Sequence, residues 1–164
     1  MATVSINPVS HTSADNDAVT CEIFIAAPRE RVFEALTDPA QASLWWGAKG
    51  VCQMDKFSMD VRTGGKWSTT GVSGANGIVE VHGEFLEIDP PRRLSYTWTS
   101  SWLEKITKVL LELENLNGGT FLKLTHTGFA GDAEATEKHT HGWNLVLVCL
   151  QAYAERGETI ASRN

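Results

Sequence analysis

A series of short alternating segments, followed by one long amphipathic segment at the C-terminal end, constrains the fold of this chain most strongly. Between residues 51 and 127, apolar and polar side chains alternate as they do in half-buried β-strands. The expected strands are residues 51–58, 66–71, 78–88, 93–99, 105–114 and 120–127. Gly64-Gly65, Asp89-Pro90-Pro91 and Asn117-Gly118-Gly119 separate them with residues that tolerate tight turns. The pattern predicts an antiparallel meander.

Helical periodicity precedes and follows this meander. A strand over residues 18–26 is followed by a helix that starts near Pro28 and ends at Asp38-Pro39, and a second short helix is expected over residues 42–46. The segment from Asp132 to Gly157 is the longest predicted helix, with Gly157 as a typical C-terminal stop. Its apolar stripe is formed by Trp143, Val146, Leu147, Leu150 and Tyr153.

These elements predict one α+β domain over residues 18–160. They can bury their apolar faces if a curved antiparallel sheet of about six or seven strands wraps around the last helix, with two short helices after the first strand. A curved sheet meets a straight helix along a line, so a wedge is left that side chains fill or that a ligand occupies. Residues 1–17 are polar and are expected to form a flexible tail.

Composition excludes several classes of function. The net charge of −6 and the absence of clustered Lys and Arg argue against nucleic acid and anionic surfaces as partners. The longest apolar run, residues 143–154, is too short and too interrupted to span a membrane. Cys21, Cys52 and Cys149 form no paired motif, so neither a disulfide framework nor a zinc site is expected, and a reducing cytoplasm fits best.

Several motifs occur together in a fixed order along the chain. They are APRERVFEALTDP, WWG, TGGKW, GEFLEIDPPRRLSYTW, GGTFLKLTHTGF and HGWNLVLVCLQAY. Over residues 20–156 the chain resembles single-domain bacterial relatives of the C-terminal domain of the activator of heat-shock-protein-90 ATPase, within the START-like (Bet v 1-like, SRPBCC) superfamily. The resemblance implies the helix-grip fold. The superfamily includes carriers of hydrophobic ligands, polyketide cyclases, resistance proteins and co-chaperone domains, so the fold alone does not decide the activity.

The candidate cavity residues are the tryptophans and the side chains expected on the inner faces of the strands and of the last helix. An indole offers apolar area and one hydrogen-bond donor, which suits a flat or aromatic ligand. The alternative is that these residues are ordinary core. The candidate set is Trp45, Trp46, Trp67, Tyr96, Trp98, Val109, Leu111, Leu122, Leu124, His126, Trp143, Leu147 and Leu150.

The polar candidates have structural alternatives that are favoured over chemical roles. His126 ends an apolar wall and would either orient a ligand or form a structural hydrogen bond, and the structural role is favoured. Glu80, His82 and Glu84 share one face of a strand, which is typical of an acid/base set or of part of a metal site, but more typical of a half-exposed strand. His139 and His141 point apart on a helix, so no metal or other cofactor is expected.

Three functions remain open, and catalytic residues stay unassigned. The first, which is favoured, is a noncatalytic binder of a small hydrophobic or aromatic molecule. The second is a cyclase or dehydratase in which Tyr96, His126 or Glu84 would move protons. The third is a module that binds a chaperone or another protein through its outer surface, and a homodimer is also compatible with the sequence. An open interior would favour the first two functions, and a filled interior would favour the third.

Overall fold

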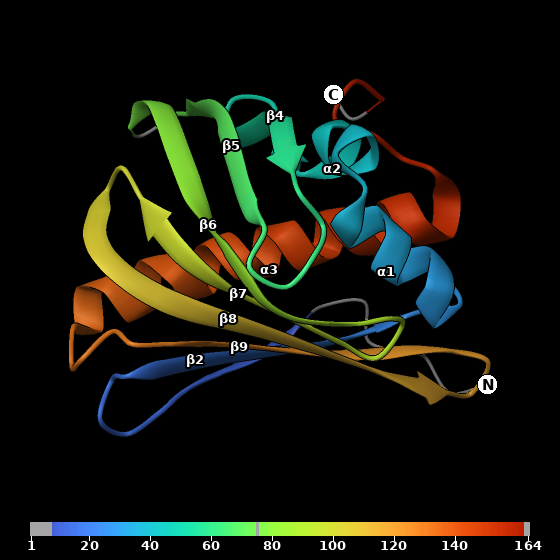
Figure 1. The fold of residues 1–164 in the computed structure, drawn as a ribbon, viewed down its shortest axis with the longest axis horizontal. Helices are drawn as coiled ribbons and strands as arrows, with labels where there is room; N and C mark the ends of the chain where they lie inside the picture. The colour runs from blue at the N-terminus through green and yellow to red at the C-terminus, as the bar shows by residue number, and fades with distance from the viewer. Residues whose placement is uncertain (1–7, 75, 163–164) are drawn as a thin grey trace.

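The computed structural model describes residues 8–74 and 76–162. Within these residues the chain forms a nine-stranded antiparallel sheet and three helices (Figure 1). The elements are β1 (Val9–Thr12), β2 (Ala18–Ile25), α1 (Arg29–Thr37), α2 (Pro39–Trp45), β3 (Gly47–Ala48), β4 (Cys52–Met59), β5 (Lys66–Ser73), β6 (Gly77–Asp89), β7 (Arg93–Ser100), β8 (Leu103–Leu116), β9 (Gly119–Thr127) and α3 (Ala133–Arg156).

The topology is a meander closed by one crossover. Strands β3 to β9 follow one another in the sheet, and β9 then pairs with β2, so that the order is β1-β2-β9-β8-β7-β6-β5-β4-β3. The sheet curves around α3, which crosses its concave side, while α1 and α2 cover one end (Figure 1). This is the predicted helix-grip fold. Within the part of the chain that the structure describes, no helix is long and apolar enough to cross a membrane.

The strand count is higher than the six or seven that were predicted, because β1 and β3 were missed. Strand β1 lies in the segment expected to be a flexible tail, yet it pairs with β2 from Val9↔Glu22 to Thr12↔Val19. Three of its four side chains are exposed, so no apolar alternation marks it in the sequence. Strand β3 has only two residues, Gly47 and Ala48. Residues 1–7 of the expected tail lie outside the described residues.

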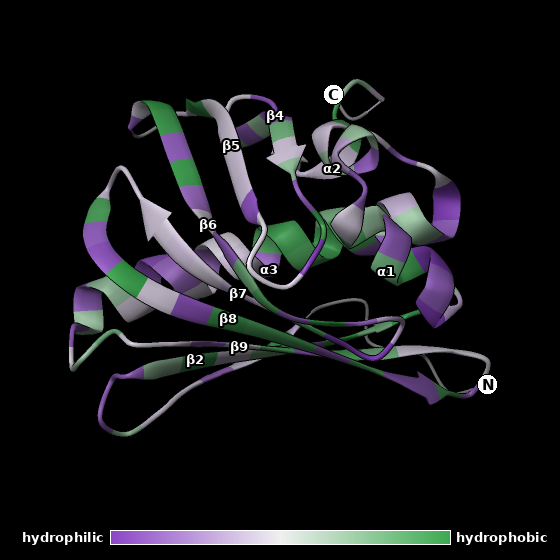
Figure 2. Cartoon of the chain, in the orientation of Figure 1, coloured by the Kyte–Doolittle hydropathy of each residue, from purple (hydrophilic) through white to green (hydrophobic). Residues whose placement is uncertain are grey.

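Local sequence signals explain the remaining elements. Asn117 and Gly118 have positive φ angles and join β8 to β9 through a two-residue turn, as the Asn-Gly-Gly motif predicted. Burial alternates strictly along β2, and hydropathy alternates along β6 (Figure 2). Helix α3 begins after Asp132, whose side chain accepts a hydrogen bond from the Ala135 N–H, and ends at the left-handed Gly157.

Helices α1 and α2 meet at Asp38. This residue ends α1 as predicted, and its carboxylate also accepts a hydrogen bond from the Ala40 N–H, which caps α2. Helix α2 therefore begins at Pro39, three residues earlier than expected, because proline suits the first helical position. The indole N–H of Trp45 donates to the Ala35 carbonyl at 3.0 Å and ties the two helices together.

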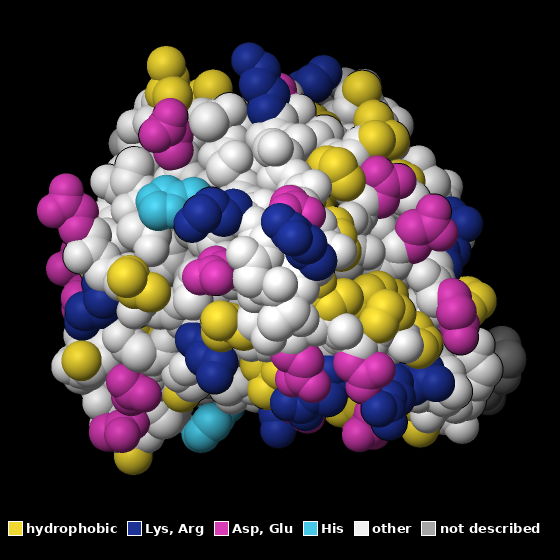
Figure 3. Space-filling view, in the orientation of Figure 1, with side chains coloured by type: hydrophobic (Ala, Val, Ile, Leu, Met, Phe, Trp, Pro, Cys, Tyr) yellow, Lys and Arg dark blue, Asp and Glu magenta, His cyan; other side chains and the backbone are white. Residues whose placement is uncertain are grey.

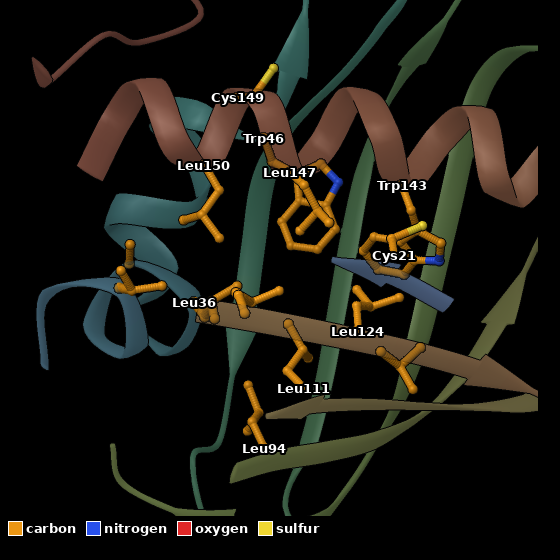
Figure 4. Close-up of a cluster of buried hydrophobic side chains, with 14 of the residues drawn as sticks. Cys21, Leu36, Trp46, Leu94, Leu111, Leu124, Trp143, Leu147, Cys149 and Leu150 are labelled. Carbon is orange, nitrogen blue, oxygen red and sulfur yellow. The ribbon is translucent and has the colours of Figure 1, made fainter. Parts of the chain in front are cut away.

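The core lies between α3 and the concave face of the sheet. Trp143, Leu147 and Leu150 point from α3 toward apolar strand residues that include Leu111 and Leu124, whereas Cys149 points away from this cluster (Figure 4). Burial of one such aliphatic side chain stabilises the fold by about 1.5–3 kcal/mol. Val146 and Tyr153, which were expected on the same stripe, are only half-buried.

Candidate functional site

A small pocket lies between the helices α1 and α2 and the inner face of strands β4 to β7. Its volume is about 20 Å³, which leaves room for roughly one water molecule. Its lining is apolar and aromatic and consists of Leu36, Trp46, Phe57, Met59, Trp67, Phe85, Leu94 and Tyr96. Packing at this place in the core is therefore incomplete, but the space that is left is small.

The pocket borders solvent on the side of β4. Phe57 and Met59 in its lining are half-buried, whereas the other lining side chains are buried. Figure 3 shows hydrophobic side chains gathered on the surface between α1 and the β6–β7 turn. Because Phe57 and Met59 already touch solvent, they are the side chains that can swing outward with the least disturbance of the core.

All thirteen predicted cavity residues lie in the interior, with at most 7% of their surface exposed. Only Trp46, Trp67 and Tyr96 line the pocket. The others pack against one another or against α3. The ten residues outside the lining are Trp45, Trp98, Val109, Leu111, Leu122, Leu124, His126, Trp143, Leu147 and Leu150.

The predicted set of cavity residues does not include five of the lining residues: Leu36, Phe57, Met59, Phe85 and Leu94. One signal was available for Leu94, which alternates with Tyr96 and Trp98 on the inner face of β7. Strand β4 gave no comparable signal, because a bulge between Met54 and Lys56 breaks its alternation.

Four indoles, here called the tryptophan belt (Trp46, Trp67, Trp98 and Trp143), contact one another in a row through the interior. Ring centroids are 5.9 Å apart for Trp46 and Trp143, 5.2 Å for Trp143 and Trp98, and 5.8 Å for Trp98 and Trp67. Such tilted and edge-to-face pairs stabilise the interior beyond the area they bury. Trp46 and Trp67 line the pocket, whereas Trp98 and Trp143 contact the ring of His126.

His126 is a structural histidine held by a chain of hydrogen bonds. The Trp143 indole N–H donates to His126 Nδ1 at 2.9 Å, so Nδ1 carries no proton and Nε2 must carry it. His126 Nε2 then donates to the Thr107 hydroxyl at 2.6 Å, which in turn donates to the Trp98 carbonyl at 3.1 Å. Burial, with a smaller contribution from His139, lowers the pKa of His126 well below its usual value, and the ring is neutral.

His139 is the second buried histidine. Its Nδ1 donates to the Ala135 carbonyl at 2.8 Å, and burial lowers its pKa. His141 is exposed, so these two histidines diverge around α3 as predicted. Within residues 8–74 and 76–162, no cluster of three or more His, Cys, Asp and Glu side chains is arranged to hold a metal ion.

The residues considered for a cyclase are not brought together. Glu84 is exposed on the outer face of β6, away from the interior. Tyr96 faces the pocket, and burial raises the pKa of its hydroxyl. Tyr96 pairs with Val109 and Val109 pairs with His126, so Tyr96 and His126 lie two strands apart, about 10 Å. His126 is also fully engaged by Trp143 and Thr107.

An open trough of about 390 Å³ lies on the outer face of strands β4 to β8. Its walls include Lys66 and Glu84, which face each other across β5 and β6, and His82, which pairs with Ser68 and Thr99. Glu80, His82 and Glu84 are all exposed here, which confirms the interpretation of a half-exposed strand. A molecule in this trough would keep much of its hydration, because the trough is open and seven of its ten wall residues are polar, beside Trp67, Gly83 and the exposed Ile106.

The cysteines are not activated for nucleophilic chemistry. Burial raises the pKa of the Cys21 thiol to about 11. Burial also raises the pKa of Cys52, with a smaller contribution from Cys149. Both groups are therefore neutral thiols near pH 7, and a thiol is a much weaker nucleophile than a thiolate.

Comparison with protein families identifies the chain. The family described as "Activator of Hsp90 ATPase homolog 1-like protein" matches residues 26–155. The chain belongs to this family. A comparison with curated proteins gave no significant match.

Solved structures share the fold of this chain. A protein of Chromobacterium violaceum is 26% identical with a TM-score of 0.72, and the match covers 85% of this chain and 97% of that one. CalU16 from Micromonospora echinospora is 23% identical with a TM-score of 0.63, over 92% of this chain and 85% of CalU16. DynU16, described as a putative protein in the dynemicin biosynthetic locus, is 22% identical with a TM-score of 0.74, over 90% of this chain and 50% of DynU16.

Proposed function

We propose that this protein binds a small, flat, apolar molecule in the pocket between α1, α2 and strands β4 to β7, and that it does so without catalysis. The observation that carries the proposal is the pocket lining, which is entirely apolar or aromatic and is half-open beside Phe57 and Met59. Ligand sites of small molecules are typically lined in this way, with a few polar groups that fix orientation.

Binding requires the pocket to expand. A cavity of roughly 150 Å³ accepts a benzene ring in a protein core, and this pocket has about 20 Å³. Met59 has a flexible, unbranched side chain, and both it and Phe57 are already half-buried at the border with solvent. Outward rotation of these two side chains creates volume while the tryptophan belt and α3 stay in place.

Two further facts support this function. DynU16, a structural neighbour, is a putative protein in a biosynthetic locus, which is compatible with the handling of small molecules. The lining places no charged side chain in contact with the pocket, so a neutral ligand loses little by entering it.

The test combines thermal stability with intrinsic tryptophan fluorescence in the presence of naphthalene, naphthol and palmitate. We expect the aromatic compounds to raise the melting temperature and to change the fluorescence in a saturable way. Met59→Ala should increase the affinity by enlarging the pocket, and Met59→Trp should block it. Ile23→Val is the matched control, because Ile23 is buried in the core outside the pocket lining.

A second candidate function, binding of a partner protein, would gain support if no compound in this test binds. A filled interior was expected to favour that function, and the pocket described above is small. Val72 and Ile78 form an exposed apolar pair on the outer face of the sheet. They lie directly opposite each other across β5 and β6, with 58% and 81% of their surface exposed. A chaperone partner or a second copy of the chain would contact such a surface. In the ligand test, a change of melting temperature or fluorescence that is as large in Met59→Trp as in wild type would contradict binding in the pocket.

A further inference from the structure

We propose that residues 56–59 of β4 form a gate over this pocket, and that the hydroxyl of Ser43 in α2 is the latch that holds the gate closed. The inference rests on the proposed function and adds how a ligand reaches that site. Ser43 is a positioning residue here, because its side chain is not part of the pocket lining and acts through the backbone of β4.

Strand β4 is held differently on its two sides. On one side it pairs with β5 along its length. On the other side β3 pairs only with Cys52 and Gln53, so residues 54–59 have no further strand beside them within the described sheet. The backbone groups on such an edge need partners from outside the sheet. This edge lies against α2, which supplies them (Figure 1).

Within the described residues, two backbone N–H groups of this edge donate toward α2. Met54 donates to the carbonyl of Trp46, the residue that follows α2, at 3.0 Å. Phe57 donates to Ser43 Oγ at 3.2 Å. The Ser43 hydroxyl itself donates to the Pro39 carbonyl at 2.7 Å, so its single proton is used and its oxygen is left to accept from Phe57. The second of these bonds is the one that holds the gate.

A bulge separates the gate from the fixed start of β4. The register with β5 shifts between Met54 and Lys56, and a bulge of this kind interrupts pairing and bends the strand. Beyond the bulge, Phe57 and Met59 are half-buried in the pocket lining, and the Phe57 ring centroid is 5.2 Å from that of Trp46. Movement of the gate away from α2 breaks one hydrogen bond and one ring contact, and it opens the pocket to solvent.

The first test measures the rates of naphthol binding by stopped-flow tryptophan fluorescence. One net hydrogen bond changes an equilibrium such as gate opening about twofold to tenfold. We expect Ser43→Ala to raise the association and dissociation rate constants by the same factor and to leave Kd unchanged, because the latch is closed in both the free and the bound protein. Ser43→Thr keeps the hydroxyl and should restore the rates of wild type.

Thr140→Ala is the matched control for the loss of a helix hydroxyl. The Thr140 hydroxyl donates to the carbonyl four residues earlier in α3 at 2.7 Å, as the Ser43 hydroxyl does in α2, and Thr140 is not part of the pocket lining. This variant should bind and release naphthol at the rates of wild type. Rates that rise as much in Thr140→Ala as in Ser43→Ala would overturn the assignment of the latch to Ser43.

Relaxation dispersion of the methionine methyl groups tests the gate in the protein without ligand. Opening moves Met59 but not Met54, which lies before the bulge. Ser43→Ala should therefore raise the population of the open state at Met59 about twofold to tenfold and leave Met54 unchanged. Exchange that rises alike at both methionines would overturn the hinge at the bulge.

The binding data separate failure of the gate from failure of the pocket. Naphthol that binds with the same rate constants in wild type and Ser43→Ala, or with a change in Kd through dissociation alone, would overturn the latch while leaving the pocket as a binding site. Failure of naphthol to bind to wild type would overturn the proposed function, and the gate with it.

Discussion

Replacement of Thr107 by valine tests the hydrogen-bond chain that fixes His126. The two side chains have nearly the same shape, but valine can neither accept from His126 Nε2 nor donate to the Trp98 carbonyl. Thr107 is 2% exposed, so water cannot replace it. One buried donor left unpaired costs about 1–3 kcal/mol, and we expect Thr107→Val to lower the free energy of unfolding by about 2 kcal/mol. In a domain of this size that corresponds to a fall in melting temperature of about 4–8 °C.

The assay is urea unfolding followed by circular dichroism at neutral pH. Thr125→Val is the matched control, because Thr125 is half-buried on the adjacent strand β9 and should change the stability by less than about 0.5 kcal/mol. If Thr107→Val were as stable as the control, His126 would not depend on the Thr107 hydroxyl. The assignment of the proton to His126 Nε2 would then be wrong.

Two further predictions follow from buried histidines and from glycines. Burial lowers the pKa of His126 and of His139 below 6.5, so below that pH the unfolded chain binds more protons than the folded chain. The free energy of unfolding should therefore fall as the pH decreases from 6.5, by up to about 1.4 kcal/mol per pH unit for each histidine. A urea midpoint that stays constant down to about pH 5 would contradict this prediction. Gly142→Ala should raise the melting temperature, because a Cβ there meets no atom within 4 Å and alanine favours the helix by about 0.5–1 kcal/mol. Gly83→Ala should lower the melting temperature, because the Cβ of the alanine would lie 1.9 Å from the Thr97 carbonyl oxygen. Equal effects of the two glycine substitutions on the melting temperature would refute the packing argument.

Much of the fold could be predicted because local signals and tertiary structure agree. The alternation along β6, the Asn117-Gly118 turn and the capped helix α3 each specify an element without reference to the rest of the chain. Strands β1 and β3 could not be predicted in this way. They are held by backbone pairing with β2 and β4, and backbone hydrogen bonds leave no pattern in the side chains.

For the site, the sequence predicts only which side chains face the interior of the domain and which face solvent. Alternation places Leu111 and Leu124 on the inner face, but it does not show that Leu147 and Leu150 of α3 point toward that face. The pocket lies where α1 and β4 pack over the inner face of the sheet, so its position depends on the packing of those two elements. The partner of His126 is likewise a tertiary feature, because Trp143 approaches it from a different element.

The most direct test of the binding pocket is the methyl resonance of Met59, recorded with methyl-labelled methionine while naphthol is added. Met59 lines the pocket, whereas Met54, on the same strand, is buried outside the pocket lining and serves as an internal control. Binding in the pocket predicts a large, saturable shift of the Met59 signal from the ring current of the ligand and a small shift of the Met54 signal. A saturating ligand that leaves the Met59 signal unmoved, or that shifts the two signals alike, would contradict the proposal that this pocket is the binding site.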